Sequence, residues 1–218
     1  MHKISNRLLD ACSALLRSTS RLKRRVVQQH PAFPIVVDEE LSLDLFHLQD
    51  AEVLFELVEK NRAYLRAWLP WLDTIQSPKD QEAFIQKTRQ QWAAQQALIL
   101  GIWYQQQLVG VISFNIFAWE HNTAQIGYWL DTAHQGHGII TRACRAIIQI
   151  AFQQLGLQSL TICCATENYK SQAIPLRLGF VWHQTIPNSE WLYDHYVDHH
   201  VYLLERTKSA VDIQQATQ

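Results

Sequence analysis

The stretch 125–141 constrains the fold of this chain more than any other part of the sequence. Its first half, 126–130, is an apolar run between polar residues and is typical of a buried strand. Its second half is a short polar loop with Gly136 and Gly138. The helix predicted after the loop has an apolar face with spacings of four and three residues (Ile139, Ala143, Ile147 and Ile150). Because the first amides of a helix lack internal partners and carry partial positive charge, this arrangement predicts an anion site.

The spacing within the loop indicates which anion it could bind. A phosphate-binding loop has a Lys followed by Ser or Thr after its second Gly, where this chain has Ile139-Ile140, and a dinucleotide-binding loop has a third Gly that is missing here. The segment 135–140, Gln-Gly-His-Gly-Ile-Ile, resembles instead the acetyl-CoA loop of the GNAT N-acetyltransferases, although that family usually ends the motif with Gly or Ala. Without a cofactor, the same residues would form a plain strand-to-helix turn.

A second match to the GNAT family lies at 168–180. There, Asn168, Ser171 and the Gly-Phe pair 179–180 resemble the family's pattern, which implies that Asn168 holds the pantetheine arm of the cofactor. The Tyr that commonly protonates the leaving thiolate is replaced by Pro175. The ribosomal-protein N-terminal acetyltransferase branch of the family has a Ser at the position of Ser171, which makes Ser171 the candidate acid. The alternative is that Ser171 only caps the next helix, with Pro175 as the fourth helical residue.

Two further segments resemble the same branch, and the resemblance extends from Leu41 to Leu204. Glu190 lies ten residues after Phe180, where the branch has a Glu base. Partial burial beside Trp191 would raise the pKa of Glu190 usefully, whereas the alternative is a surface Glu in a hairpin loop. The second segment is an aromatic run within 61–71, for which core packing under a loop is the alternative. Three aromatic residues are expected to contact the substrate: Trp68, Trp71 and Tyr193.

The resemblance implies direct transfer of an acetyl group from acetyl-CoA to a primary amine, with Glu190 as base and Ser171 as acid. Backbone amides around Trp129 and Leu130 would polarise the thioester carbonyl. The residues expected at the cofactor are Tyr128, Trp129, Leu130, Gln135, Gly136, His137, Gly138, Ile139 and Asn168. The His and Cys residues have no spacing typical of metal ligands, so no metal is expected.

The fold class predicted from these patterns is α/β, with the GNAT fold and a mixed central sheet of about six to seven strands flanked by helices. An antiparallel meander should precede a parallel β-α-β unit, made of strand 125–131, helix 138–155 and strand 159–165. Among the other helices, we predict one from Asp50, a second short one over 61–68, a third capped by Ser77, and a short one near 172–178. The folded domain should span 31–207, between a basic extension, 1–30, and a polar tail, 208–218.

Charge is distributed unevenly along the chain. Residues 1–30 carry seven Lys and Arg and one Asp, a net charge of +6, which leaves −7 for the remainder. The basic extension could be a solvated tail, an organellar targeting segment, or an arm that contacts the ribosome or RNA. It lacks the features of a secretory signal, and no apolar run reaches transmembrane length. The four Cys are expected to be reduced thiols in a cytoplasmic protein.

Three functions remain open from the sequence. The first is acetylation of the N-terminal α-amine of a protein, such as a ribosomal protein. The second is acetylation of a small amine: a polyamine, an amino sugar or an amino acid. The third is a CoA-binding module without turnover, which the missing Tyr at Pro175 favours and the presence of Ser171 and Glu190 disfavours. Related enzymes in this branch are often homodimers, but the sequence shows no self-complementary surface.

Overall fold

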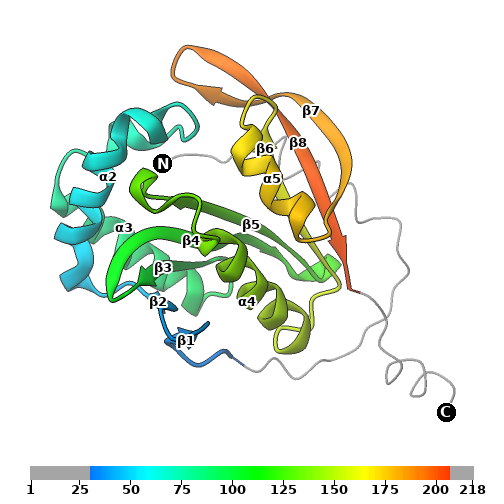
Figure 1. Ribbon diagram of the computed structural model, residues 1–218, viewed down its shortest axis with the longest axis horizontal. Helices are drawn as coiled ribbons and strands as arrows, with labels where there is room; N and C mark the ends of the chain where they lie inside the picture. The colour runs from blue at the N-terminus through cyan, green and yellow to red at the C-terminus, as the bar shows by residue number, and fades with distance from the viewer. Residues whose placement is uncertain (1–29, 207–218) are drawn as a thin grey trace, which may run out of the picture.

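The computed structural model describes residues 30–206. The polar tail and all of the basic extension except His30 therefore lie outside the described residues, so the predictions for these two segments stay untested. Within the described range, eight strands form one mixed sheet, where about six to seven were predicted (Figure 1). The strands are β1 (Ile35–Val36), β2 (Leu41–Leu45), β3 (Leu98–Tyr104), β4 (Gln107–Ala118), β5 (Thr123–Leu130), β6 (Ser159–Ala165), β7 (Val181–Leu192) and β8 (His195–Glu205).

The order of the strands in the sheet is β1-β2-β3-β4-β5-β6-β8-β7. All neighbouring pairs are antiparallel except β5 and β6, which are parallel and are joined by a helix, as the β-α-β prediction requires. The helices are α2 (Ala51–Arg66), α3 (Pro78–Ala93), α4 (Ile139–Gln153) and α5 (Tyr169–Arg177). Short 3-10 turns lie at Leu48–Asp50, Leu72–Thr74, Trp119–His121 and Thr132–His134. No helix within 30–206 is both long and apolar enough to cross a membrane.

Helices cover both faces of the sheet, and each face has its own apolar core (Figure 1). One core includes the buried face of α4, with Ile139, Ala143 and Ile147, as the helical spacing predicted. The other contains buried residues of α2 and α3. Successive strand residues alternate between the faces, so Tyr128 packs against the α4 side and Trp129 against the α2–α3 side.

The parallel strands β5 and β6 run side by side for only part of their length. Their register pairs Thr123–Ile126 with Ser159–Ile162 and then ends. Beyond that point β5 stays paired with β4 as far as Leu130, while β6 stays paired with β8 as far as Ala165. The sheet therefore opens between the carboxyl ends of two parallel strands, where α/β sheets usually bind ligands.

Helix α2 is continuous, so the prediction of a separate short helix over 61–68 is wrong. Asn61 lies within α2 and is only 2% exposed. Its Nδ2 donates to the Leu57 carbonyl and to Oδ1 of Asp131, both at 3.0 Å. These bonds offset the low helix propensity of Asn. From the sequence alone, the Asn at this position indicated a helix boundary.

The predicted capping role of Ser77 is also wrong. Its backbone lies at the N-cap of α3, but the side chain makes no cap hydrogen bond. The Ser77 hydroxyl donates instead to Oδ2 of Asp80 at 2.8 Å. The same carboxylate oxygen accepts from the backbone N–H of Gln76 at 3.0 Å, so Asp80 organises the entry to the helix.

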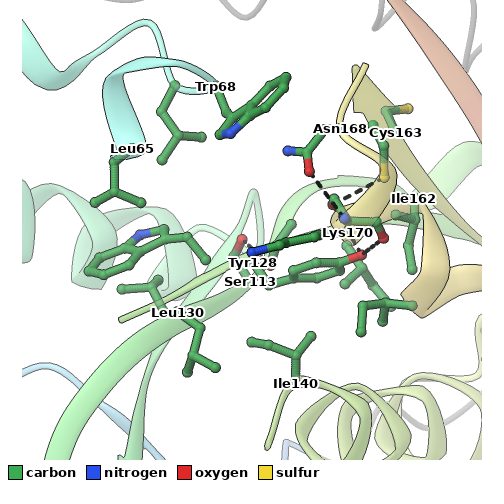
Figure 2. Close-up of a pocket in the computed structure, with 18 of the residues that line it drawn as sticks. Leu65, Trp68, Ser113, Tyr128, Leu130, Ile140, Ile162, Cys163, Asn168 and Lys170 are labelled. Atoms are coloured by element: carbon green, nitrogen blue, oxygen red, sulfur yellow. Dashed lines mark hydrogen bonds between the residues drawn. The ribbon is translucent and has the colours of Figure 1, made fainter. Parts of the chain in front are cut away.

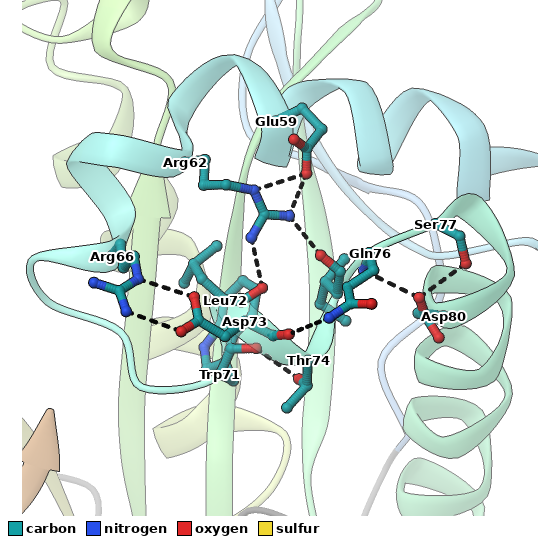
Figure 3. A network of polar contacts seen from close by, with 11 residues as sticks. Glu59, Arg62, Arg66, Trp71, Leu72, Asp73, Thr74, Gln76, Ser77 and Asp80 are labelled. Atoms are coloured by element: carbon teal, nitrogen blue, oxygen red, sulfur yellow. Dashed lines mark hydrogen bonds and ion pairs between the residues drawn. The ribbon is translucent and has the colours of Figure 1, made fainter. Parts of the chain in front are cut away.

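Two arginines of α2 hold the connection between α2 and α3 (Figure 3). Arg62 donates through Nη1 to the Leu72 carbonyl at 2.7 Å and through Nη2 to the carbonyl of Ile75. Arg66 forms a bidentate pair with Asp73, with both N–O distances at 2.9 Å. This connection carries two of the predicted substrate-binding aromatics, so its fixed shape bears directly on the site.

Asp131, the residue after β5, anchors α2 to the glycine loop. It is 1% exposed and lies 2.7 Å from Nζ of Lys60, 3.0 Å from Nδ2 of Asn61 and 2.9 Å from Nδ1 of His134. Burial alone would raise the pKa of the Asp131 carboxyl, but these hydrogen bonds outweigh burial and hold the pKa at about 2.

Replacing Asp131 should destabilise the fold in a pH-dependent way. Because the folded-state pKa lies below its ordinary value, the charged carboxylate stabilises the fold above pH ~4, and this stabilisation is lost as the pH falls toward ~2. We expect Asp131→Asn to lower the free energy of unfolding by about 2 kcal/mol at neutral pH. Urea denaturation followed by circular dichroism between pH 7 and pH 3 measures this, and the difference from wild type should shrink below pH ~4.

The control is Glu56→Gln, which removes an exposed carboxylate from α2 and should leave the stability unchanged. A difference between Asp131→Asn and wild type that is absent at neutral pH, or that does not vary with pH, would contradict the anchoring role of Asp131.

Candidate active site

A cavity of about 1210 Å³ lies where β5 and β6 diverge. Residues from both faces of the sheet line it, with Leu65 and Trp68 from the α2 side and Ile140 from α4 (Figure 2). Tyr128 lies between these two groups in the same view. The cavity therefore passes through the sheet at the opening between the strands. Its volume exceeds the usual range for one drug-sized ligand, so it can hold parts of two reactants.

The glycine loop forms one wall on the α4 side. Gly136 and Gly138 both adopt left-handed backbone conformations, with φ of 86° and 70°, and Gly138 is the N-cap of α4. A Cβ built on either residue would meet no atom within 4 Å, so the loop presents open backbone to the cavity. All of the predicted loop residues, 135–139, line the cavity. The geometry fits a phosphate group held by loop and first-turn amides.

Several basic residues line the same wall, and the sequence analysis did not predict most of them. Arg142 and Arg145 lie on α4, and Lys170 and Arg177 lie on α5. Nζ of Lys170 is 3.2 Å from Oε1 of Gln135, so α5 reaches the loop directly. The signal available in the sequence was the i, i+3 pair of arginines on the helix that follows the glycine loop.

Asn168, not Ser171, caps α5, so the capping alternative for Ser171 is wrong. Oδ1 of Asn168 accepts from the backbone N–H of Ser171 at 3.1 Å, and the helix begins at Tyr169, three residues before the predicted start. Ser171 is thus the third helical residue, and its hydroxyl does not cap the helix. Pro175 is the seventh residue rather than the fourth, and lies inside the helix.

The Tyr128 hydroxyl bonds a backbone carbonyl that Pro175 leaves without its usual helical donor. Proline has no N–H, so within α5 it cannot donate to the carbonyl of Ser171, four residues earlier. The Tyr128 hydroxyl donates to that carbonyl at 2.9 Å. Sequence reasoning placed Tyr128 at the cofactor but missed this contact, because the two residues are 43 positions apart.

The Ser171 hydroxyl lies between two other polar side chains and faces the cavity. Its Oγ is 3.4 Å from the Tyr128 hydroxyl and 3.3 Å from Sγ of Cys164. Burial raises the pKa of the Cys164 thiol to about 11 and that of Tyr128 well above its ordinary value, so both stay protonated at neutral pH. The Ser171 hydroxyl donates to the Tyr128 hydroxyl and contacts the Cys164 thiol, and both of these neighbours are uncharged at neutral pH.

Glu190 lies in β7 and lines the cavity, so it is not a surface residue of a hairpin loop. Burial raises its pKa to about 7. The predicted cause, packing beside Trp191, is wrong, because neighbouring strand residues point to opposite faces. Trp191 is 49% exposed and packs edge-on against Tyr196 at a centroid distance of 4.8 Å. The apolar surroundings of Glu190 are provided by the cavity side of the sheet.

The predicted substrate-binding aromatics separate into two groups. Trp68 and Trp71 line the cavity on the α2–α3 side, together with apolar residues of the sheet such as Trp129. Tyr193 is not among the lining residues. Its hydroxyl donates to the Leu69 carbonyl at 2.6 Å, and the Arg66 guanidinium lies 3.7 Å from the centre of its ring. Tyr193 therefore ties the β7–β8 hairpin to the α2–α3 connection, and its role in substrate binding stays a prediction.

The remaining predicted residues line the same cavity. Leu130 lies at the end of β5 and Asn168 at the start of α5, on opposite sides of the opening (Figure 2). Among residues 30–206, no group of three or more His, Cys, Asp or Glu could hold a metal ion.

Comparison with known proteins gives the family. The family model of the acetyltransferase (GNAT) domain matches residues 40–181, which are more than half of the chain. The ribosomal-protein-serine acetyltransferase of Escherichia coli (strain K12) is 34% identical over 168 residues, which are 77% of this chain and 94% of that protein.

Two solved structures are similar along most of their length. The microcin C7 self-immunity acetyltransferase MccE, in complex with acetyl-CoA and AMP, is 32% identical with a TM-score of 0.75, over 78% of this chain and 94% of that one. RimL, a ribosomal L7/L12 alpha-N-protein acetyltransferase in complex with coenzyme A, is 27% identical with a TM-score of 0.76. The match covers 79% of this chain and 97% of that one. The chain belongs to the GNAT family and is an acetyl-CoA-dependent N-acetyltransferase.

Proposed function

We propose that this enzyme acetylates the N-terminal α-amine of a protein, with a ribosomal protein as the first acceptor to test. The observation that carries the proposal is a cavity through the sheet that has the glycine loop on one face and a partly buried carboxyl, Glu190, with a pKa of about 7. The relative from Escherichia coli is named for acetylation of a ribosomal protein. Such an acceptor implies a cytoplasmic location.

The cofactor would enter from the α4 side. The amides of 136–140 and the basic side chains of α4 and α5 would hold its pyrophosphate. The backbone groups of 127–130 that face β6 have no ladder partner there, because the pairing of β5 with β6 ends at Ile126. Around Trp129 and Leu130, the amides alternate in direction: the N–H of Asp131 donates to Val109, so Trp129 also faces β4 and Leu130 faces the opening. The Leu130 amide would polarise the thioester carbonyl.

Glu190 would act as the base, directly or through a water. An amine is protonated at neutral pH and must lose a proton before its nitrogen can attack. A carboxyl with a pKa of about 7 is half ionised near neutrality, which matches the task better than an ordinary carboxyl does. Since the base works in its ionised form, kcat/KM should rise as the pH rises through about 7.

Ser171 would give a proton to the departing thiolate. Its hydroxyl is not used as a helix cap, and no carboxylate within residues 30–206 forms a hydrogen bond with it. Tyr128 fixes the helix turn that carries Ser171, through the Ser171 carbonyl. This arrangement replaces the family's usual Tyr, whose position Pro175 occupies.

A small-molecule amine is the second candidate acceptor. Trp68 and Trp71 provide flat apolar surface at the cavity, which suits a compact aromatic or aliphatic amine as well as a peptide end. A module without turnover is disfavoured by the two side chains suited to proton transfer, Glu190 and Ser171. Two further proposals are separate from the choice of acceptor. One is that the basic extension contacts RNA or the ribosome, and the other is that the protein forms a homodimer.

The glycine loop yields a prediction on cofactor affinity. In Gly138→Val, a β-branched residue would occupy a left-handed conformation and the loop amides would shift. We expect the Kd for acetyl-CoA to rise about tenfold, which corresponds to about 1.4 kcal/mol. Isothermal titration calorimetry measures it.

The matched control is Gly156→Val, which places the same residue at another left-handed position, beyond the opposite end of α4 and outside the cavity. Because Gly156 is buried and Gly138 is exposed, Gly156→Val should cost at least as much stability as Gly138→Val, but it should leave the Kd unchanged. Equal affinities for acetyl-CoA in wild type and Gly138→Val would exclude the proposed loop as the anion site.

The function is tested by acetyl-CoA turnover, measured as thiol release and by product mass, on peptides that begin with Ser, Ala or Met and on small amines such as spermidine and an aminoglycoside. We expect turnover on Ser- or Ala-initiated peptides, and none on the same peptides with a blocked N-terminus. Both Glu190→Gln and Ser171→Ala should lower kcat/KM roughly 100-fold on the preferred peptide.

Glu205→Gln, an exposed carboxylate on β8, serves as the control and should be fully active. Turnover on a small amine alone would select the second candidate. Full activity of Glu190→Gln would remove the base assignment, and full activity of Ser171→Ala would remove the acid assignment.

A further inference from the structure

A histidine outside the described mechanism shares the cavity with Glu190. His199 lies on β8 and lines the same cavity. Glu190 pairs with Val197 across the β7–β8 ladder, so His199, two residues further along β8, projects from the same face as Glu190. Nε2 of His199 is 3.7 Å from Oε2 of Glu190, and the two side chains are only 9% and 20% exposed.

The other ring nitrogen identifies the tautomer of His199. Nδ1 is buried and has no hydrogen-bond partner among residues 30–206. A neutral imidazole carries one N–H, and placing it on Nδ1 would bury an unsatisfied donor, which proteins avoid more strictly than an unpaired acceptor. The favoured tautomer therefore has its proton on Nε2, the nitrogen that faces Glu190.

Burial keeps this histidine neutral. It lowers the pKa of His199 to about 4, and the nearby carboxylate of Asp198 offsets only part of that effect. Oδ1 of Asp198 is itself engaged by the backbone N–H of Asn188 at 2.7 Å. At neutral pH the contact between His199 and Glu190 is thus between a neutral N–H donor and a carboxylate, and not an ion pair.

Burial is the cause of the raised pKa of Glu190, and no charged group within residues 30–206 contributes to that shift. The remaining ionisable residues that line the cavity come from the other elements around it: Tyr64 on α2, Tyr128 on β5, His137 in the loop, Arg142 and Arg145 on α4, Cys163 and Cys164 on β6, and Lys170 and Arg177 on α5. His199 is the residue whose polar atom approaches the Glu190 carboxylate.

We propose that His199 is a positioning residue, whose Nε2–H donates to the carboxylate of Glu190 and aims its free oxygen at the acceptor amine. The inference rests on the proposed role of Glu190 as base. The distance of 3.7 Å is longer than a hydrogen bond, and catalytic contacts of this kind commonly tighten when substrate binds. Packing alone would not require a histidine here, because an apolar ring could fill the space without burying an unpaired nitrogen.

Three variants separate orientation from packing. His199→Gln places an amide N–H near the position of Nε2, whereas His199→Asn, one methylene shorter, places it near Nδ1. His199→Phe keeps the ring and removes the donor. The readout is the pH dependence of kcat on the preferred acceptor, because kcat reports the pKa values of the enzyme–substrate complex, in which the contact would be closed. Thermal unfolding and the Kd for acetyl-CoA are measured on each variant to check the fold.

We expect His199→Phe and His199→Asn to lower kcat at neutral pH about tenfold. Both should also move the acidic midpoint of the kcat profile upward by about one pH unit, because a donor that stabilises the carboxylate in the substrate complex is lost. His199→Gln should keep the wild-type midpoint. A purely structural role predicts instead that the midpoint stays constant in all three variants, and that result would overturn the proposal. A His199→Gln profile that matches His199→Phe would overturn it as well.

A double variant separates this inference from the proposed function. In the Glu190→Gln background, His199→Phe should cause no further loss, because the two residues act through one contact. If Glu190→Gln is fully active, the base assignment fails. If Glu190→Gln is inactive but His199→Phe has the wild-type profile, only the role of His199 fails. Should His199→Phe not fold, the contrast between His199→Gln and His199→Asn decides the question.

Discussion

The parting of β5 and β6 is the constraint on which the rest of this structure depends. Both strands keep their pairing with outer neighbours, but their mutual register ends at Ile126 and Ile162. A continuous sheet would separate the α4 face from the α2–α3 face completely. Because the ladder opens at the carboxyl ends of parallel strands, one cavity connects the two faces, and a cofactor on one side can meet an acceptor on the other.

The two faces of this opening differ in their chemistry. On the α4 side, left-handed glycines, helix-start amides and arginines favour a polyanion. On the α2–α3 side, Trp68, Trp71 and Trp129 line the cavity. Glu190, a partly buried carboxyl on β7, also lines it, and burial raises its pKa to about 7. Ser171 is held between neutral hydroxyl and thiol groups. The proposed proton acceptor and the proposed proton donor thus have different surroundings, as a site that uses both at one pH requires.

The parts of this arrangement that are local in the sequence could be predicted, and those set by tertiary contacts could not. The loop around Gly136 and Gly138 was recognisable because its conformation requires those residues. The continuity of α2 through Asn61 depends on a hydrogen bond to Asp131, far along the chain.

The same limit applies to the neighbours of the two catalytic candidates, Ser171 and Glu190. Tyr128 supports Ser171 because Pro175 leaves the Ser171 carbonyl without its helical donor, and the hydroxyl that donates to this carbonyl comes from β5. His199 was one of several unassigned histidines until the β7–β8 register placed it beside Glu190. Sequence patterns specify backbone conformation well, but they do not specify which distant side chain completes a polar contact.

Amide hydrogen exchange with and without acetyl-CoA tests most directly whether the opening between β5 and β6 is the reaction site. The account predicts that acetyl-CoA slows exchange in the segments 127–130 and 136–140, where backbone groups face the opening, and leaves β2 and β3 unchanged. Tight binding of acetyl-CoA without slower exchange in both segments would place the cofactor elsewhere and contradict the account.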